Sequence, residues 1–346
     1  MIYGDIYQTS GGYLYDRKLK DYLERKGDEV KVISMENKDY LENIKDNFSG
    51  ELLEKFDGLD IDILLEDELN HPSLFHLNDK IDNYPVVSIV HHLSHLASEG
   101  EKSEMYRYFE EKYLKSVDGF VFSSTETRDS VENLIGDTDG IVAVPGCDHI
   151  RVDRSEIEID DKRYGEQFNV LFVGNIAEHK GLDKLLDALE LVDDKVRLKI
   201  IGRLDLEPDY AERILDRAVN FPNVDVLGYV EDNVLREEMK KCDLLVLPSR
   251  YEGFGLVILE AFAFGKPVIS TCRGGPCSIV SDGENGFLID PDDENDIAEK
   301  IDYFVDNPSE LVRIGDNARR SYERSECWEY SMERVRVYLK QVSNLR

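Results

Sequence analysis

The sequence lacks several features that define whole classes of protein. Its five cysteines contain no Cys-x-x-Cys pair, which argues against a disulfide framework or a zinc site and fits a reducing compartment. No run of about 18 apolar residues occurs, so no transmembrane helix is expected. The opening segment, MIYGDIYQTSGG, has an early Asp5 and no basic stretch, so it lacks the pattern of a signal peptide. We therefore expect a cytoplasmic protein.

Basic residues are also scarce. The chain has 73 acidic against 42 basic residues, for a net charge of −31. Such a surface repels nucleic acid and anionic lipid, so we expect no nucleic-acid partner. The acidic residues are spread along the chain, and we interpret them as solvation chemistry, either simple acidity or adaptation to a salt-rich cytoplasm. This composition carries no information about a reaction.

Short apolar runs alternate with amphipathic segments along the chain. This alternation is typical of βαβ units, in which helices cover both faces of a parallel sheet. The runs expected to be strands are residues 29–34, 61–67, 85–92, 118–124, 169–175, 197–202, 223–228, 243–249 and 267–270. Segments 13–27, 181–192 and 294–307 are expected to be helices.

The alternation breaks once, around residues 146–168, where the pair Pro145–Gly146 and a dense run of charges precede a new strand. We interpret this segment as a linker and hinge. The sequence therefore predicts two Rossmann-like domains, residues 1–148 and 149–327. The final segment, about residues 328–346, is expected to be a helix that crosses back to the first domain, although the residues alone would allow either assignment.

Glycine-rich or basic positions follow several of the expected strands, at the edge where doubly wound sheets bind ligands. The loop Thr9–Gly12 (TSGG) could bring backbone N–H groups to a phosphate, and a simple tight turn would explain it equally well. Lys180 begins a helix after the strand that ends at Gly174, and Arg203 follows the next strand. Two cations at one edge of so acidic a chain suit a diphosphate, the alternative being a solvated loop.

Two glutamates bracket the segment EGFGLVILE. Glu252 precedes an apolar helix and is expected to point into the crevice, while the glycines free the first N–H groups of that helix for an anion or sugar hydroxyls. Glu260 lies on the helix itself, and a carboxylate is rarely buried without a partner. A ribose diol would satisfy Glu260, and so would a local arginine or a backbone donor.

Two histidines end the expected strand 85–92, at the same kind of ligand edge. His91, His95 and Glu99 have i, i+4, i+8 spacing, which would suit a metal only on a helix, and we expect no metal. We expect instead that one of the histidines, His91 or His92, contacts a polar substrate group, or that it is structural. The sequence contains no GxSxG, nucleophilic Cys–His or Walker A motif.

EGFGLVILE and its surroundings, residues 223–270, resemble the signature of the retaining glycosyltransferases of family 4. Segments 173–189 and 274–293 are also similar to the family pattern, and residues 10–34 resemble its opening glycine loop and helix. The resemblance covers most of the chain. It implies a GT-B fold, two Rossmann-like doubly wound α/β domains facing a central cleft. It also implies transfer of a sugar from a UDP- or GDP-type nucleotide sugar to an acceptor hydroxyl, with retained configuration and no further cofactor.

The resemblance further implies a role for each matching residue. Lys180 would bind the diphosphate, Glu260 the ribose hydroxyls and Glu252 the transferred sugar. Asn175 stands where the family usually has an arginine, and Arg203 is the candidate substitute. The other implied donor contacts are the amides of Phe254, Gly255 and Leu256 at the sugar and diphosphate, Tyr229 and Val230 at the base, Gly12 at the phosphate and His91 beside the donor sugar. Of all these residues, His91, Glu252 and Lys180 would act in catalysis.

The acceptor is left open between a glycan, a lipid-linked molecule and a small molecule, recognised mainly by the first domain. Relatives that act on lipid acceptors suggest a peripheral place at the inner membrane face. The candidate contact, residues 16–26, mixes Lys and Arg with Asp and Glu, and we interpret it as a solvated helix face. Competing interpretations of the fold are a sugar-nucleotide epimerase, a glycogen-type phosphorylase and a non-catalytic nucleotide-sugar-binding protein.

The acidic composition generates a prediction for stability. If the chain is adapted to a salt-rich cytoplasm, its melting temperature should rise with salt, because screening weakens repulsion among like charges. Circular dichroism melts at low and high NaCl measure this directly. A lower melting temperature at high salt would contradict the adaptation.

Overall fold

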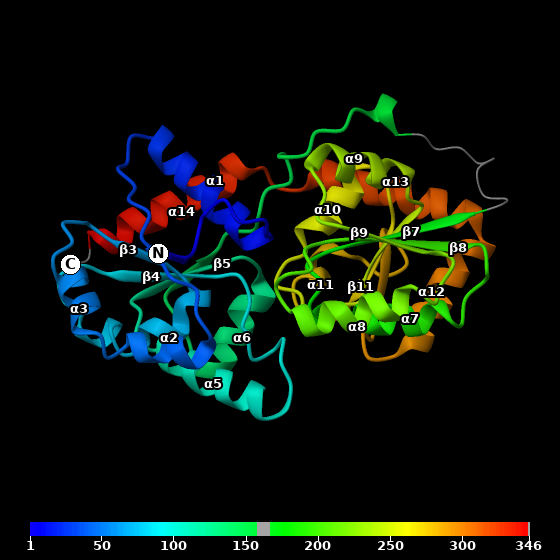
Figure 1. Ribbon diagram of the computed structural model, residues 1–346. Helices are drawn as coiled ribbons and strands as arrows, with labels where there is room; N and C mark the ends of the chain where they lie inside the picture. The colour runs from blue at the N-terminus through cyan, green and yellow to red at the C-terminus, as the bar shows by residue number, and fades with distance from the viewer. Residues whose placement is uncertain (158–166, 345–346) are drawn as a thin grey trace. The chain divides into compact units, whose positions relative to one another are not determined.

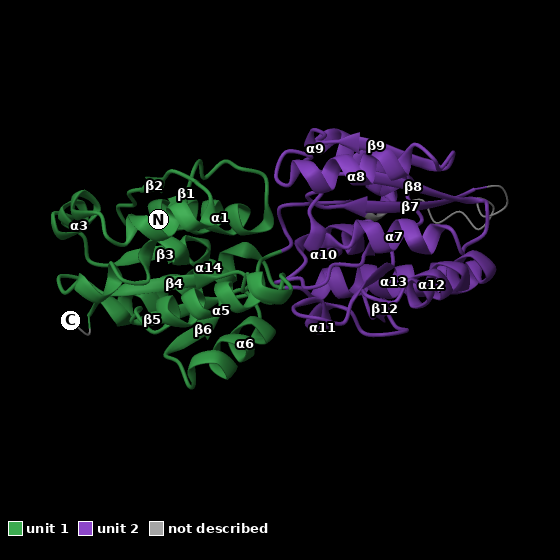
Figure 2. Cartoon of the chain, turned by 60° about the horizontal axis from the view of Figure 1, so that its bottom comes forward, with its two compact units in different colours: residues 1–146, 326–346 green, residues 147–325 purple. Residues whose placement is uncertain are grey.

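The computed structural model describes residues 1–157 and 167–344 of the 346-residue chain. The chain divides into two compact units, residues 1–146 together with 326–346 (unit 1) and residues 147–325 (unit 2), as Figure 2 shows. The predicted boundary lies two residues beyond the observed one. Much of the linker predicted over residues 146–168 falls outside the described residues.

Unit 1 contains a four-stranded parallel sheet and a separate two-stranded parallel pair. The larger sheet has the order β3-β4-β5-β6, formed by Leu64–Asp67, Val86–Val90, Gly119–Phe122 and Gly140–Val142. Every residue of β4 and β5 is buried, as expected for parallel strands covered on both faces. The pair consists of β1 (Ile2–Tyr3) and β2 (Ser34–Met35).

Helices cover both faces of this sheet. α1 packs against α14 on one face, while α2, α4, α5 and α6 lie on the other (Figure 1). The helices of unit 1 are α1 (Gly11–Arg25), α2 (Tyr40–Asp46), α3 (Gly50–Asp57), α4 (His71–Leu74), α5 (Gly100–Leu114), α6 (Thr125–Ile135) and α14 (Trp328–Ser343).

The last helix belongs to unit 1. The hydroxyl of Tyr338 accepts from the backbone N–H of Phe120 at 3.2 Å and donates to the carbonyl of Asp139 at 2.9 Å, so α14 is bonded to the sheet. Gly119 makes room for this contact, because a Cβ there would lie 2.2 Å from the Tyr338 hydroxyl. Residues at the two ends of the sequence therefore build one core.

The strand expected over residues 29–34 is wrong except at its last residue. β2 consists of Ser34 and Met35, and its partner β1 is equally short. The two strands therefore form two residue pairs, and β1 is too short to pair with a longer strand. Val32, in the middle of the expected strand, is 41% exposed. Alternating apolar residues predicted a strand, but the segment has no long neighbour with which to form one.

Unit 2 contains a six-stranded parallel sheet of order β12-β11-β10-β7-β8-β9. In chain order its strands are β7 (Phe168–Val173), β8 (Val196–Ile201), β9 (Val224–Gly228), β10 (Leu244–Leu247), β11 (Val268–Thr271) and β12 (Gly286–Ile289). The helices are α7 (Leu182–Leu189), α8 (Pro208–Ala218), α9 (Asp232–Lys241), α10 (Leu256–Ala263), α11 (Pro276–Ile279), α12 (Glu294–Asp306) and α13 (Pro308–Arg324). α7, α8 and α12 cover one face, and α9, α10 and α13 the other (Figure 1).

The strand order reverses in the middle of this sheet, between β7 and β10, and doubly wound sheets bind ligands at such a point. The N–H of Arg250 donates to the carbonyl of His179 at 2.8 Å, which ties the loop after β10 to the loop after β7. Gly181 has a left-handed φ of 67°, and a Cβ there would lie 2.0 Å from the carbonyl oxygen of Pro248. This close approach fixes the spacing of the two loops.

None of the helices in the described ranges combines the length and the apolar character needed to span a bilayer.

Gly181→Ala should destabilise unit 2 more than Gly100→Ala destabilises unit 1. Both glycines are left-handed, which costs alanine about 1–2 kcal/mol, but at Gly100 no neighbouring atom lies within 4 Å of the place that a Cβ would take. Overlap with Pro248 adds about 1–3 kcal/mol to the cost at Gly181. Urea unfolding followed by circular dichroism measures both. Equal losses in the two variants would contradict the close contact between the loops.

Candidate functional site

An ion pair joins the two loops at the switch point of unit 2. Lys180 Nζ donates to Glu252 Oε2 at 2.7 Å, and Ser249 Oγ donates to the same oxygen at 3.2 Å. The Lys180 and Glu252 side chains are 18% and 17% exposed, so the pair is partly desolvated yet open to a ligand. Two residues predicted separately, one for the diphosphate and one for the sugar, are therefore direct partners in the protein.

Glu252 is held by its backbone as well as its side chain. Its carbonyl accepts from the N–H of Gly275 at 2.8 Å, and its own N–H donates to the carbonyl of Arg273 at 3.3 Å. A Cβ at Gly274 would lie 2.2 Å from the Glu252 carbonyl oxygen, so the two chain segments touch. The glycine tail after β11, noted in the sequence only as part of a resemblance, thus buttresses the loop that carries Glu252.

α10 starts directly after this loop, at Leu256, with Gly255 as its left-handed N-cap residue at φ 91°. The first N–H groups of a helix have no partner within the helix, and they carry the positive end of its dipole. Phe254, Gly255 and Leu256 lie at this end, close behind Glu252 in the sequence. The predicted anion contacts and the Lys180–Glu252 pair thus share one edge of the sheet.

Glu260 has a protein partner that sequence reasoning missed. Glu260 Oε1 lies 3.0 Å from His149 Nε2, and the two side chains are 15% and 13% exposed. The partner is neither the arginine nor the backbone donor considered from the sequence. His149 is 111 residues away along the chain, so no local spacing could have indicated the pairing. Among the described residues no partner is found for Glu260 Oε2, which leaves that oxygen for a ligand.

Arg203 lies beside the loop that holds Asn175, as its place after β8 predicts. Its carbonyl accepts from the Ile176 N–H at 2.9 Å. Its guanidinium is engaged by Asp205, with Nε to Oδ1 at 2.9 Å and Nη2 to Oδ2 at 2.6 Å, and this pairing lowers the pKa of Asp205. A diphosphate would have to compete with Asp205, so the role of Arg203 as substitute cation stays a prediction.

The two residues predicted to contact the base follow β9. Tyr229 is 54% exposed, and Val230 is half-buried against the core of unit 2. A large exposed aromatic ring beside a packed aliphatic side chain offers a flat surface on which a base could stack. No contact in the described residues tests that use.

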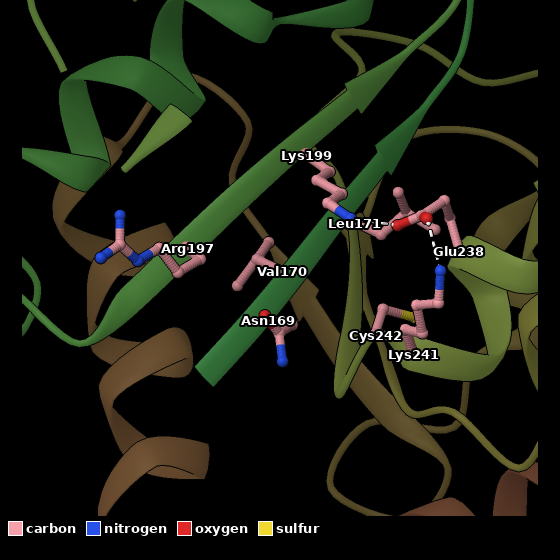
Figure 3. Close-up of a pocket in the computed structure, with 8 residues that line it drawn as sticks. All are labelled: Asn169, Val170, Leu171, Arg197, Lys199, Glu238, Lys241 and Cys242. Atoms are coloured by element: carbon pink, nitrogen blue, oxygen red, sulfur yellow. Dashed lines mark hydrogen bonds and ion pairs between the residues drawn. The ribbon is translucent and has the colours of Figure 1, made fainter. Parts of the chain in front are cut away.

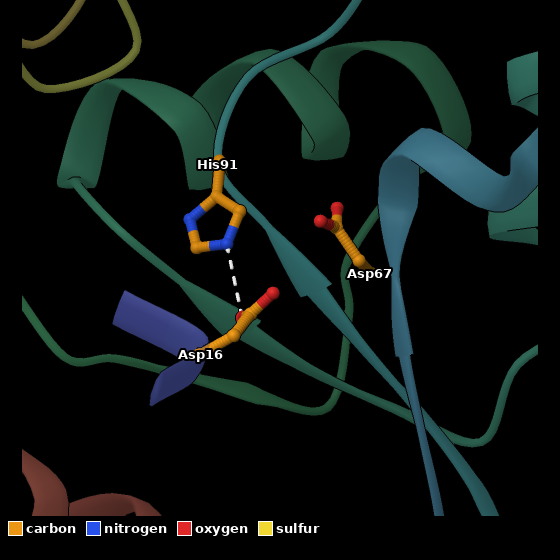
Figure 4. A group of neighbouring side chains, drawn as sticks. All are labelled: Asp16, Asp67 and His91. Atoms are coloured by element: carbon orange, nitrogen blue, oxygen red, sulfur yellow. Dashed lines mark hydrogen bonds and ion pairs between the residues drawn. The ribbon is translucent and has the colours of Figure 1, made fainter. Parts of the chain in front are cut away.

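In unit 1, His91 lies just after β4, where a glycine and an aspartate from α1 meet an aspartate from β3. His91 Nε2 is 3.3 Å from Asp16 Oδ1, and Asp67 lies across from them (Figure 4). A Cβ at Gly12 would lie 2.9 Å from His91 Cδ2. Gly12 therefore leaves room for the His91 ring. This is a structural reason for glycine at the position, in addition to its predicted contact with the phosphate. Asp16, four residues after Gly12, shares its helix face and could have been found from that spacing.

The hypothetical His91–His95–Glu99 metal face is wrong, because no helix forms between β4 and α5. His95 Nδ1 instead lies 2.5 Å from Glu110 Oε2 on α5. Within the described residues, two other groups have ligand atoms close enough to hold an ion, namely Asp16 with Asp67 and His91, and Glu68 with His71 and Glu110. The expectation that no metal is used stays a prediction.

Carboxylates near His91 have perturbed acidities. Burial, reinforced by the charge of Asp16, raises the pKa of Asp67 to about 6. Burial also raises the pKa of Glu68 to about 7, opposed by His71 and reinforced by Glu110. Such shifts cluster at functional sites, although buried structural networks produce them too.

A cavity of about 220 Å³ lies elsewhere in unit 2, at the start of β7 and β8 and beside the end of α9 (Figure 3). Glu238 bonds both Lys199 and Lys241 there. Its lining residues are Asn169, Val170, Leu171, Arg197, Lys199, Glu238, Lys241 and Cys242, and none of them is a predicted site residue. The cavity is at the opposite end of these strands from the Lys180 loop.

Residues 153–321 match the family model described as "Glycosyl transferases group 1". The match contains Lys180 and Glu252 of the switch-point loops, and Glu260 on α10. The matched residues belong to this family. The family prediction is therefore confirmed.

Curated relatives include an uncharacterized glycosyltransferase of Methanocaldococcus jannaschii, 34% identical over 50% of this chain and 48% of the relative. The O-antigen chain mannosyltransferase C of Escherichia coli is 28% identical over 72% of this chain and 67% of the relative. The capsular polysaccharide biosynthesis glycosyltransferase CapM of Staphylococcus aureus is 30% identical over 52% and 49%. The chain spans about half the length of the first and third of these relatives.

Solved structures extend the likeness to the whole fold. A sucrose-phosphate synthase from Thermosynechococcus elongatus has a TM-score of 0.82 and 18% identity over 100% of this chain and 99% of its own. The Anabaena protein HepE in complex with UDP-glucose has a TM-score of 0.76 and 18% identity over 98% of both chains. At this identity the likeness speaks for the fold alone. The predicted α/β class with two parallel sheets, of GT-B type, is confirmed.

Glu260→Ala should weaken the binding of nucleoside diphosphates about tenfold or more, since a hydrogen bond to a charged group contributes about 1.5–3 kcal/mol. His149→Ala is the matched control, because it removes the same contact but keeps the carboxylate. Titration calorimetry with UDP and GDP measures both variants. If both variants bind as the wild type does, Glu260 has a structural role with His149 and no role at the ribose.

Proposed function

We propose that the protein is a retaining glycosyltransferase that moves a sugar from a nucleotide-sugar donor to an acceptor hydroxyl. The observation that carries the proposal is the Lys180–Glu252 pair at the switch point, next to the N-terminus of α10. Family membership supports the reaction class. HepE, which has a similar fold, is seen in complex with UDP-glucose. Unit 2 is the proposed donor-binding unit, and unit 1 the proposed acceptor-side unit.

The ion pair suits a site that must exchange one anion for another. Without donor, Glu252 neutralises the Lys180 ammonium at 2.7 Å. A diphosphate with two or more negative charges competes for that ammonium and releases the carboxylate, which can then accept hydrogen bonds from sugar hydroxyls. Lys180 and the first amides of α10 would stabilise the charge that develops on the leaving diphosphate as the bond to the sugar breaks. This step requires no nucleophile from the protein.

The nucleoside would be held by residues that flank this centre. Glu260 offers its remaining lone pairs to the ribose diol, while His149 fixes the carboxylate. Tyr229 and Val230 would lie against the base, and Arg203 would reach the diphosphate if it leaves Asp205. His91 is the proposed contribution of unit 1 to the donor sugar. A UDP- or GDP-type donor fits these groups equally.

The favoured acceptor is a glycan hydroxyl. The relatives named for capsular polysaccharide and O-antigen synthesis support this class over a small molecule. A lipid-linked glycan at the inner membrane face stays within the proposal. The reaction would take place in the cytoplasm, where nucleotide sugars are made available to such enzymes.

A second candidate is a nucleotide-sugar-binding protein without transferase activity. Two observations favour it: Asn175 replaces the usual arginine, and Arg203 is already paired with Asp205. Such a protein would bind the donor and release no nucleoside diphosphate from it. A thermal-shift screen of nucleotide sugars, followed by an assay for UDP or GDP release, separates the two functions.

Lys180→Ala should lower turnover by roughly 100-fold, the scale expected for loss of one charge contact to the transition state. Lys184→Ala is the matched control, since Lys184 lies one helical turn further along and pairs with Glu294 at 2.7 Å, away from Glu252. The measurement is release of nucleoside diphosphate from the donor found in the screen, with and without EDTA. Activity is expected to survive chelation. Near-normal turnover of Lys180→Ala would remove Lys180 from the mechanism.

A further inference from the structure

The ring of His91 is held from several sides within unit 1. Its Nε2 lies 3.3 Å from Asp16, its backbone carbonyl accepts from Ser123 Oγ at 3.0 Å, and Tyr15 packs edge-on with ring centroids 5.3 Å apart. Gly12 closes the remaining side, because it has no Cβ to push the ring away. These contacts leave the imidazole little freedom to rotate, so its two nitrogens have fixed directions.

Gly12 and Asp16, two of the residues that hold the ring, come from the start of α1. Ser10 caps this helix by accepting from the Tyr13 N–H at 3.2 Å, and Gly12 and Asp16 then fall one turn apart on the same face. The Thr9–Gly12 loop and the start of α1 therefore together position the His91 ring. The Asp16 side chain is almost fully buried, and its second oxygen, Oδ2, has no hydrogen-bond partner among the described residues.

We propose that Asp16 is a positioning residue that accepts the Nε2–H of His91 and so makes Nδ1 the ring nitrogen offered to the substrate. No partner for Nδ1 is found in the described part of the chain, and Figure 4 shows Nε2 directed at Asp16. The ligand would be an oxygen of the donor, either a sugar hydroxyl or a diphosphate oxygen. This step rests on the proposed function and deepens it, because it names the atom of His91 that acts.

The charged groups around the ring shift the pKa of His91, which determines whether Nδ1 carries a proton. Burial disfavours the charged imidazolium, but the hydrogen bond and charge of Asp16, with Asp67 and Glu68, outweigh burial and raise the pKa of His91. Asp16 faces the ring from α1, Asp67 from the end of β3 and Glu68 from the turn after it. A doubly protonated ring donates from both nitrogens. In that state His91 would donate a hydrogen bond to the substrate from Nδ1 and could not act as a general base.

The experiment uses the full chain and compares Asp16→Asn with Asp21→Asn. Asparagine keeps the shape of Asp16 but removes its charge, while Asp21 lies on the same helix with its side chain 70% exposed. Nuclear magnetic resonance of protein labelled with 13C,15N-histidine follows His91, assigned through His91→Gln. The His91 titration should move to lower pH in Asp16→Asn and should not move in Asp21→Asn. An unchanged titration in Asp16→Asn would overturn the inference.

A second measurement needs no variant at residue 16. In the wild type, above the His91 titration, the 15N shifts should show the proton on Nε2 and a bare Nδ1. A proton on Nδ1 instead would overturn the inference even if Asp16→Asn failed to fold. Both spectra are recorded without substrate, so a positive result with no turnover of any nucleotide sugar would reject the proposed function alone.

Kinetics test the catalytic consequence. With the donor found in the screen, Asp16→Asn should lower kcat about tenfold or more while the donor KM stays within about twofold, because a misplaced donor weakens the transition state more than binding. The high-pH limb of the kcat profile, where charged His91 is lost, should move to lower pH. A normal kcat with an unmoved limb would show that Asp16 is merely structural.

Discussion

The site depends on a single charge contact, the ion pair between Lys180 and Glu252. It joins the loop after β7 to the loop after β10, and these loops meet only because the strand order of the sheet reverses between those strands. Gly181 permits the close approach of the loops, and the tail at Gly274 and Gly275 supports Glu252 from behind. A partly buried pair of this kind is poor evidence of stability, but it holds two opposite charges ready for a ligand.

Much of the fold follows from local patterns in the sequence. The strands at 85–92 and 243–249 are continuous apolar runs with clear ends, and the structure has strands within both. Residues 29–34 alternate apolar and polar side chains, which also predicts a strand, but they have no long neighbour and form a strand at one end alone. Strand formation depends on a partner, and the identity of a partner is tertiary information that periodicity does not contain.

The same limit applies to the site. Spacing and residue type were enough to bring Lys180, Glu252 and the start of α10 to one edge, because each follows a predicted strand. The partner of Glu260 could not be predicted, since His149 comes from a distant segment with no motif of its own. The pairing of Arg203 with Asp205 could in principle have been predicted, because the two are two residues apart. The sequence does not show, however, whether an arginine binds a nearby carboxylate or the diphosphate of a ligand. Competition between protein and ligand for the same charge is a property of the folded site.

The return of α14 to unit 1 has a consequence for how the chain is made. The sheet of unit 1 is complete by residue 142, yet the helix that bonds Phe120 and Asp139 begins at Trp328. Unit 2 is, in effect, an insertion within unit 1. During synthesis from the N-terminus, unit 2 has all of its own segments first, and the unit that emerges earliest is the last to close its core. Until then α1 has that face of the sheet to itself, and the part of the face that α14 covers in the complete protein stays exposed.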